Sequence, residues 1–579
     1  MTADAPTVTA SGPLSAVDLG IVWARLLALV DEAGDALKRT AFSTVTRESN
    51  DFAVVLMDRE GRGIAQSSIS VPSFLGVLPM LTKALLAGDF PQEKWRPGDA
   101  VMTNDPWLCA GHKPDIGVVS PLFVGDRLVG FVGTIAHSPD MGGALWGAGA
   151  RDLYEEGLMV PPTLLYAEGE PNETLFSIIA ANVRAPRQTL GDVRAQVAAN
   201  DQAAAGLAPI LDEAGLDSLE GVSAQIRGAS ERAMREALLA APDGTYRYAY
   251  DADGDGRGEP VHIEIAVTID GDAILVDYDG TSGPHSLGIN AVLNYVYAYT
   301  AYPIKCAFSP DVPNNDGAFE PITVTAPEGS LLNARPPVPL GARNITGNML
   351  HAAVFGALVQ AVPDRVQADC GAPCWSVVLN GQDERGETYV EYFFLNGGYG
   401  ARPTRDGEGV LSFPTNVANV PVEVLERSMP VLFLEKSLRP GSGGDGQYRG
   451  GLGQTTAFRW EGDGPVNLSL LTEKTRHRAA GLAGGEDGAT GSARISPPRD
   501  LAPKGLTRLH PGDVLTLDLP GGGGFGPPDR RDAAARARDH QLGYVTASKS
   551  EVGRAKSDVE TAPPHPPAPT AEPAEAPDA

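Results

Sequence analysis

Residues 103–143 read TNDPWLCAGHKPDIGVVSPLFVGDRLVGFVGTIAHSPDMGG, and their pattern indicates how the N-terminal part of the chain folds. Two apolar runs flank Gly125-Asp126, which is typical of a hairpin turn, so the stretch predicts two neighbouring strands. His112 and Asp115 stand three residues apart in a turn that contains Pro114, and both can point at one place. We expect His137 to return to them at the end of the next strand.

The flanking sequence predicts a mixed α/β (α+β) chain of several regions. Ser15-x-x-Asp18 resembles a capping box and precedes apolar residues at helical spacing. Residues 52–66 are typical of a hairpin with its turn near Asp58. The rest predicts, in order, helices over 187–239, a β-meander over 245–280, helices over 286–301 and 346–361, and strands and turns over 376–526.

Changes in composition divide the chain into five parts. These are a flexible leader (1–13), an N-terminal region that carries the histidine-containing stretch (14–240), a central α/β region (241–375), a β-rich C-terminal region (376–526) and a tail (527–579). The tail is first charged and then rich in Pro and Ala. Because such a composition buries no core, we expect the tail to be disordered.

The charge of the chain excludes two classes of partner. The 579 residues carry 46 Lys and Arg against 73 Asp and Glu, a formal net charge of −27. This field repels phosphate backbones and anionic lipid surfaces, which argues against nucleic acid and membranes. Four cysteines are too few for a disulfide scaffold, and the first residues lack the features of a signal peptide. We therefore expect a cytoplasmic location.

Several familiar motifs fail on inspection. Residues 251–256 copy the start of an EF-hand loop, but His262 stands where the calcium site requires a bidentate Glu, so we expect a hairpin turn. No GxxxxGK[ST] phosphate-binding loop occurs, and the chain therefore shows no recognisable ATP site. Glycine-rich runs such as 520–526 are expected to let backbones pack closely.

Imidazoles and carboxylates are concentrated in the opening stretch. The candidates between positions 105 and 140 are Asp105, His112, Asp115, His137 and Asp140. Two imidazoles with carboxylates form a ligand set that suits Zn, Mn or Fe. The alternative is that the Asp residues cap turns and the histidines are structural. The spacing leaves both interpretations open.

Three blocks of this stretch, TNDPW (103–107), GHKPDI (111–116) and AHSPDMGG (136–143), resemble hallmark blocks of the hydantoinase B/oxoprolinase family. This family comprises the second subunit of ATP-dependent hydantoin and lactam hydrolases and of acetone and acetophenone carboxylases. Further similar blocks follow in the family's order, and the resemblance covers about residues 14 to 526. One departure is Ser138, because the family often has a second histidine there.

The resemblance implies a divalent transition metal (Zn, Mn or Fe) in this subunit. By position, its ligands are Asp51, His112, Asp115 and His137. Asp105 and Asp140 are then candidate catalytic bases, or residues that orient the histidines. The resemblance also implies a hetero-oligomer with a hydantoinase A-like, actin-like subunit that binds ATP.

Our functional hypothesis is the metal-bearing subunit of an ATP-dependent amidohydrolase that opens a cyclic amide such as a hydantoin, 5-oxoproline or a related lactam. It is expected to be active only with its partner. The alternatives are a subunit of an ATP-dependent ketone carboxylase and a non-catalytic scaffold, although the ligand set weighs against the scaffold. Arg343 and Asn344 are candidates for substrate or subunit contacts, with a solvated or turn-stabilising role preferred.

Overall fold

The computed structural model describes residues 13–545 except 373, 383–385 and 387. The chain divides into two compact units, one up to Arg531 and one from Asp532 onward. The predicted leader, apart from its last residue, and the tail beyond residue 545 lie outside the described residues. Among the residues that are described, no helix is both long enough and apolar enough to cross a membrane.

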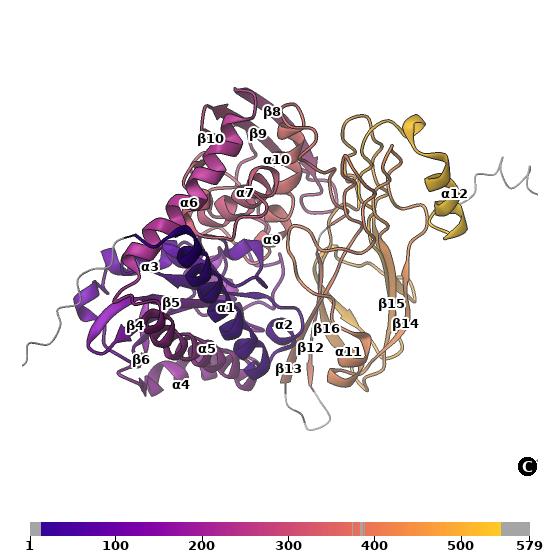
Figure 1. Ribbon diagram of the computed structural model, residues 1–579. Helices are drawn as coiled ribbons and strands as arrows, with labels where there is room; N and C mark the ends of the chain where they lie inside the picture. The colour runs from indigo at the N-terminus through magenta and orange to yellow at the C-terminus, as the bar shows by residue number, and fades with distance from the viewer. Residues whose placement is uncertain (1–12, 373, 383–385, 387, 546–579) are drawn as a thin grey trace, which may run out of the picture. The chain divides into compact units, whose positions relative to one another are not determined.

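The N-terminal part of the first unit is built around a seven-stranded antiparallel sheet with the order β2-β1-β5-β4-β3-β6-β7 (Figure 1). The strands are β1 (Phe52–Met57), β2 (Gly63–Gln66), β3 (Ala100–Thr103), β4 (Asp115–Val124), β5 (Arg127–His137), β6 (Thr163–Ala167) and β7 (Glu170–Pro171). The two hairpins predicted from the sequence, β1–β2 and β4–β5, are confirmed.

Helices cover both faces of this sheet. Alternate residues of β1 belong to two different apolar clusters: Phe52, Val54 and Leu56 pack with α1 and α5, whereas the residues between them pack with α3. A strand buried on both faces has no polar face, which explains the uninterrupted apolar run. The surrounding helices are α1 (Ala16–Thr40), α2 (Thr44–Arg47), α3 (Val77–Ala87), α4 (Glu173–Asn182), α5 (Pro186–Glu213) and α6 (Glu220–Leu239), with 3-10 turns η1 (Pro72–Phe74), η2 (Gln92–Lys94) and η3 (Leu153–Glu156).

The central part contains a four-stranded sheet with the order β11-β10-β9-β8. Its elements are β8 (Gly244–Ala252), β9 (Val261–Asp270), β10 (Ala273–Asp277), β11 (Ile322–Thr325), α7 (Leu293–Phe308), α8 (Asp316–Phe319), α9 (Arg343–Gly347) and α10 (Leu350–Leu358). The helix expected from residue 286 begins later, at Leu293. The Asn290 side chain explains this difference: it accepts from the His285 N–H at 2.7 Å and donates to the His285 and Leu287 carbonyls, so these groups are not available to a helix.

The C-terminal part consists of two antiparallel sheets that share one apolar core, as the β-rich sequence predicts. Their elements are β12 (Trp375–Gln382), β13 (Thr388–Leu395), α11 (Val422–Ser428), β14 (Val431–Leu438), β15 (Gln454–Trp460), β16 (Val466–Leu471), β17 (Ser492–Ser496), β18 (Lys504–Leu509), β19 (Val514–Asp518) and the 3-10 turn η4 (Pro528–Arg530). The mixed α/β class is thus confirmed, while the exact region boundaries stay a prediction.

The second unit contains a helix that differs from the predicted disordered tail. Residues Ala533–Gln541 form α12, and the Asp532 carboxylate accepts the N–H groups of Ala534 and Ala535 at its start. This segment has too few apolar residues to form a core, which led to the prediction of disorder. Ala and Arg are nevertheless strong helix formers, which explains the helix.

Glycine-rich segments pack backbone against backbone beside the C-terminal sheets. Gly522 donates its N–H to Gly451 at 3.0 Å and accepts from Gly444 at 2.9 Å. A Cβ atom on Gly522 would lie 2.2 Å from the Tyr399 carbonyl oxygen, and one on Gly450 would lie 1.9 Å from the Gly522 oxygen. These glycines are therefore required for close packing, as expected from the sequence.

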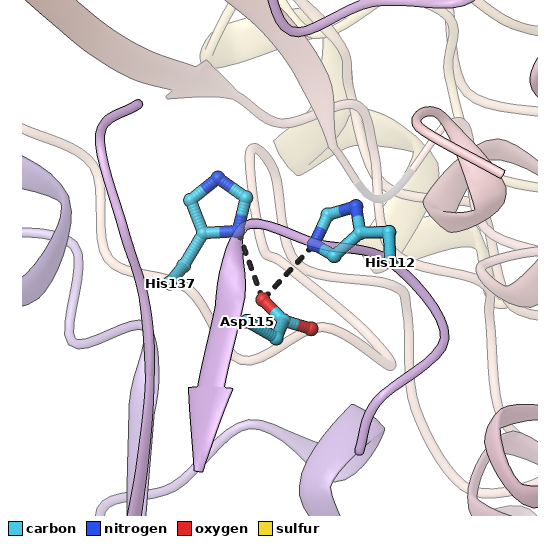
Figure 2. Close-up of side chains that lie close together, drawn as sticks. All are labelled: His112, Asp115 and His137. Atoms are coloured by element: carbon cyan, nitrogen blue, oxygen red, sulfur yellow. Dashed lines mark hydrogen bonds and ion pairs between the residues drawn. The ribbon is translucent and has the colours of Figure 1, made fainter. Parts of the chain in front are cut away.

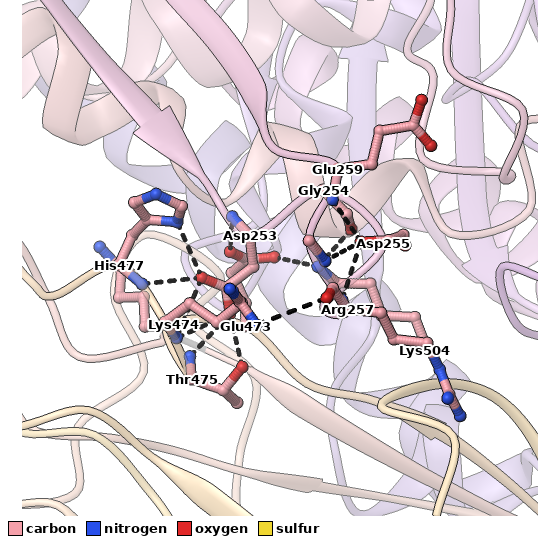
Figure 3. A network of polar contacts seen from close by, with 12 residues as sticks. Asp253, Gly254, Asp255, Arg257, Glu259, Glu473, Lys474, Thr475, His477 and Lys504 are labelled. Atoms are coloured by element: carbon pink, nitrogen blue, oxygen red, sulfur yellow. Dashed lines mark hydrogen bonds and ion pairs between the residues drawn. The ribbon is translucent and has the colours of Figure 1, made fainter.

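The EF-hand-like segment is a hairpin turn held by protein donors (Figure 3). The buried Asp253 carboxylate accepts from the Thr475 N–H and hydroxyl at 2.7 Å and from the His477 N–H at 2.9 Å. Lys504 Nζ in turn bonds the Gly254 carbonyl at 2.6 Å and Glu473 Oε2 at 2.5 Å. This network fastens the β8–β9 turn to the C-terminal part of the first unit.

The glycine packing leads to a stability prediction. Gly522→Ala forces a backbone clash and should cost at least the roughly 1–3 kcal/mol of an overpacked core. Gly464→Ala is the matched control, because a Cβ there meets no atom within 4 Å. Thermal unfolding should show a clear loss of Tm for Gly522→Ala and little change for the control; equal Tm values would contradict the packing argument.

A second prediction concerns Glu391, which is buried on β13 and accepts from the Thr44 hydroxyl at 2.7 Å. Burial raises the pKa of Glu391 from 4.5 to about 7, against the lowering effects of Thr44 and Arg47. The folded chain therefore binds this proton more tightly than the unfolded chain, so the group's contribution to stability is lost as the pH rises through 4.5 to 7. Glu391→Gln should raise stability by roughly 1–3 kcal/mol at pH 8 and by much less at pH 5. Denaturant unfolding at both pH values tests this, and an equal change at both would contradict it.

Candidate metal centre

Three adjacent strands of the large sheet bring the predicted ligands to one edge. Asp115 is the first residue of β4 and pairs in register with His137, the last residue of β5. Asp51 immediately precedes β1, and its carbonyl accepts from the His137 N–H at 3.1 Å. His112 lies in the turn before β4, where its carbonyl accepts from the Asp115 N–H at 3.3 Å. The hairpin register therefore joins residues that lie far apart in the sequence.

His112, Asp115 and His137 form a buried cluster whose potential ligand atoms all lie within 4.8 Å of one another (Figure 2). His137 Nδ1 lies 3.0 Å from Asp115 Oδ1, and His112 Nε2 lies 2.9 Å from the same oxygen. Figure 2 shows both imidazoles directed at this carboxylate from opposite sides. Two imidazoles and a carboxylate are a ligand set for a divalent transition metal.

The hydrogen bonds of His112 leave one ring nitrogen available to a metal. Its Nδ1 lies 2.9 Å from the Gly341 carbonyl oxygen, which only accepts, so Nδ1 carries the proton of the neutral ring. The Nε2 atom then carries a lone pair, which faces the Asp115 oxygen. Within the described residues, the buried Nε2 atoms of both His112 and His137 have no hydrogen-bond partner. Such orphaned acceptors fit a bound cation, and the residues present therefore fit the metal that the sequence implies.

The charges at the site favour an ionised Asp115 and a neutral His112. Burial alone would raise the pKa of Asp115, but the Arg343 guanidinium and the two imidazoles outweigh it and hold this pKa well below its usual range. Burial, reinforced by Arg343, lowers the pKa of His112 to about 4. Burial raises the pKa of Asp51 to about 6. An ionised carboxylate beside a neutral imidazole is the protonation state that a metal requires of its ligands.

A small cavity of ≈ 40 Å³ adjoins the cluster. Asp51 lines this cavity with the three clustered residues, although it is outside the 4.8 Å group. The wall is otherwise largely apolar and aromatic. It comprises Val71, Ser73, Trp146, Tyr295, Tyr299, Arg343, Asn344, Asn348, Cys374, Phe394, Thr415 and Val417.

Arg343 is buried at this site, which corrects the solvated or turn-stabilising role preferred from the sequence. The residue is 4% exposed, and its guanidinium is ion-paired with the Asp115 carboxylate. It also donates to the Ala110 carbonyl and lies 4.1 Å from the ring centroid of Tyr295. No spacing in the sequence links α9 to the histidine stretch, so only packing reveals this contact.

The structure places Asp105 and Asp140 away from the cavity wall. The Asp105 carboxylate accepts from the Trp107 N–H at 2.9 Å and so caps its turn. Asp140 is ion-paired with Arg184 at 2.6 Å. In the part of the chain that the structure describes, neither carboxylate bonds to His112 or His137. Their assignment as catalytic bases stays a prediction, and the contacts seen here are those of structural residues.

Glu156 is a site-supporting residue that sequence reasoning missed. Its Oε1 accepts from the N–H groups of Leu340 and Gly341, both at 2.6 Å. The Gly341 carbonyl then accepts from His112 Nδ1 and, at 2.5 Å, from Trp146 Nε1. Glu156 thus positions the Gly341 carbonyl, which selects the tautomer of His112. Glu156 lies in a turn, and no sequence motif marks it as part of the site.

Comparison with known proteins identifies the family. The model of the hydantoinase B/oxoprolinase family matches residues 15–528, and the chain belongs to this family. A candidate B-type subunit of a D-/L-hydantoinase from Pseudomonas sp. (strain NS671) is 31% identical, over 93% of this chain and 94% of that protein. The 5-oxoprolinase 1 of Arabidopsis thaliana is 26% identical over 88% of this chain, which spans only 42% of that longer protein.

Two solved structures share the fold. The ATP-dependent caprolactamase from Pseudomonas jessenii is 27% identical with a TM-score of 0.84, covering 92% of this chain and 95% of that chain. A nucleotide-free acetone carboxylase superposes with a TM-score of 0.81 over 95% of this chain and 84% of that chain, but is only 18% identical. The family resemblance seen in the sequence is therefore confirmed.

The cluster makes a direct prediction about metal content. Purified chain should contain close to one equivalent of Zn, Mn or Fe by elemental mass spectrometry, because the ligand set is buried and incomplete without a cation. His112→Ala and His137→Ala should each lose most of this metal. The matched control is His262→Ala, whose side chain is 43% exposed on β9. Metal absent after reconstitution, or retained in both site variants, would show that the cluster is not the ligand set.

Proposed function

We propose that this chain is the metal-bearing subunit of an ATP-dependent amidohydrolase that opens a cyclic amide. The observation that carries the proposal is the buried convergence of Asp115 with two imidazoles whose Nε2 atoms lack partners. The proposal is supported by the family, by a relative described as a hydantoinase subunit and by the similarity to a caprolactamase.

Asp51, His112, Asp115 and His137 would hold the metal. When bound, a divalent metal supplies Lewis acidity toward a carbonyl oxygen and makes nearby water more acidic. The chain's own groups prepare the rest of the site. Arg343 offers a buried positive charge to an oxygen that gains negative charge during the reaction, and Gly341 keeps the proton of His112 on Nδ1.

ATP would be bound by a partner subunit of the hydantoinase A type, because this sequence lacks a recognisable phosphate-binding loop. An unactivated amide is a poor electrophile, and phosphorylation of its oxygen by the partner would remove the amide resonance. The apolar wall formed by Trp146, Tyr295 and Phe394 then limits the water that reaches the activated group. The two subunits would form a hetero-oligomer with no activity in either alone.

The test is turnover of the co-expressed complex. Hydantoin, 5-oxoproline and ε-caprolactam should be screened with ATP, and at least one should be hydrolysed with ADP formed in step. His112→Ala and His137→Ala should lower kcat by at least about 10²-fold, while the exposed His262→Ala keeps the wild-type rate. ATP turnover that requires bicarbonate and a ketone would instead establish a carboxylase. If none of these substrates is turned over, the alternative of a non-catalytic scaffold subunit is favoured.

A further inference from the structure

The cavity beside the candidate metal centre is lined by two asparagines, Asn344 and Asn348, whose side-chain Oδ1 atoms have no hydrogen-bond partner, and Asn348 is the more deeply buried of the two. Asn348 directly follows α9, lines the cavity and is 3% exposed. Its Oδ1 has no hydrogen-bond partner, and among the described residues none is formed by its Nδ2 either. Its backbone is fully used, since the N–H donates to Asn344 and the carbonyl accepts from His351 Nδ1 at 2.8 Å.

A buried acceptor without a partner, such as the Asn348 oxygen, is unfavourable unless a ligand satisfies it. A primary carboxamide presents an acceptor oxygen and a donor N–H side by side. The group that satisfies both is a second amide whose own N–H and carbonyl lie on the same side, which is the cis arrangement. Open-chain secondary amides are trans, whereas a small ring forces the cis form. The pairing is the same if the Asn348 oxygen and nitrogen exchange places, so it does not depend on how the amide plane is turned.

We propose that Asn348 is the residue that selects a cyclic amide, by accepting the ring N–H and donating to the ring carbonyl. This inference rests on the proposed function and names the feature of the substrate that this site recognises. It separates lactams and hydantoins from lactones, ketones and N-alkylated rings, none of which has both groups. A site built to bond a substrate N–H rejects analogues that lack it much more strongly than an apolar pocket rejects a change of size.

The experiment measures dissociation constants by calorimetry on the full-length, metal-loaded chain. The probes are matched pairs with and without the ring N–H: 2-pyrrolidinone with N-methyl-2-pyrrolidinone, hydantoin with 1,3-dimethylhydantoin, and ε-caprolactam with its N-methyl derivative. γ-Butyrolactone is added because it lacks the N–H without the added methyl group. Wild type should bind at least one N–H compound roughly tenfold or more tightly than its partner compound.

Asn348→Ala should reduce this ratio to about twofold or less and weaken binding of the N–H compound by roughly tenfold. Asn348→Asp keeps an acceptor and loses the donor, so it should keep the ratio but weaken binding of both compounds of a pair, since both present the ring carbonyl. Unchanged affinities in this variant would overturn the role of Asn348 even if the Ala variant fails to fold. The matched control is Asn396→Ala, which removes another buried Asn with an unpaired Oδ1 that does not line this cavity. This control should keep the wild-type ratio.

The possible failures are distinguishable. If wild type binds N–H and N-methyl compounds equally, or if Asn348→Ala keeps the preference, the role of Asn348 is overturned while the amidohydrolase proposal stands on its turnover assay. If no cyclic amide binds and the complex turns none over, both proposals are overturned. Thermal unfolding of each variant establishes that a lost preference reflects the missing amide and not a loss of folded protein.

Discussion

The centre of this protein depends on the buried negative charge of Asp115. A carboxylate 1% exposed would be very unfavourable without compensation, and the Arg343 guanidinium and His137 Nδ1 supply it. Arg343 comes from α9, so its ion pair joins the central part of the first unit to the large sheet. The candidate site and the packing of these two parts therefore depend on the same interaction. The negative charge of Asp115 orients the ligands and also attracts Arg343 of the central part.

The same region is well packed yet incompletely satisfied. The Nε2 atoms of two histidines and the Oδ1 atom of Asn348 lie buried without a hydrogen bond, whereas Glu156 and Arg343 are bonded to several groups each. Folding normally eliminates unpaired buried polar atoms, and where they remain in a cavity they mark places that a ligand completes. The surrounding hydrogen bonds keep these unpaired atoms in position. The unpaired atoms lower the stability of the folded chain, and packing elsewhere in the fold has to offset this loss.

The C-terminal part contributes to the site although it lies far from the ligands in the sequence. Phe394 of β13, Thr415 and Val417 line the cavity, and Tyr392 stacks on Trp146 with ring centroids 5.1 Å apart. The packed glycine segments hold this part together, and the Asp253 network fastens it to the rest of the first unit. Residues of the C-terminal part thus complete the wall of the cavity beside the N-terminal sheet.

The amino-acid sequence alone predicts the hairpins β1–β2 and β4–β5, most of the helices and the meeting of Asp115 with His137. Apolar periodicity and turn residues act over a few neighbours, and a short hairpin turn sets the register of its strands. That Arg343 and Asn348 line the same cavity, and that Asp105 and Asp140 bond to other groups, follows only from the packing of the whole chain. Every carboxylate in a turn looks alike in sequence, and contacts between residues more than two hundred positions apart depend on how the whole chain packs.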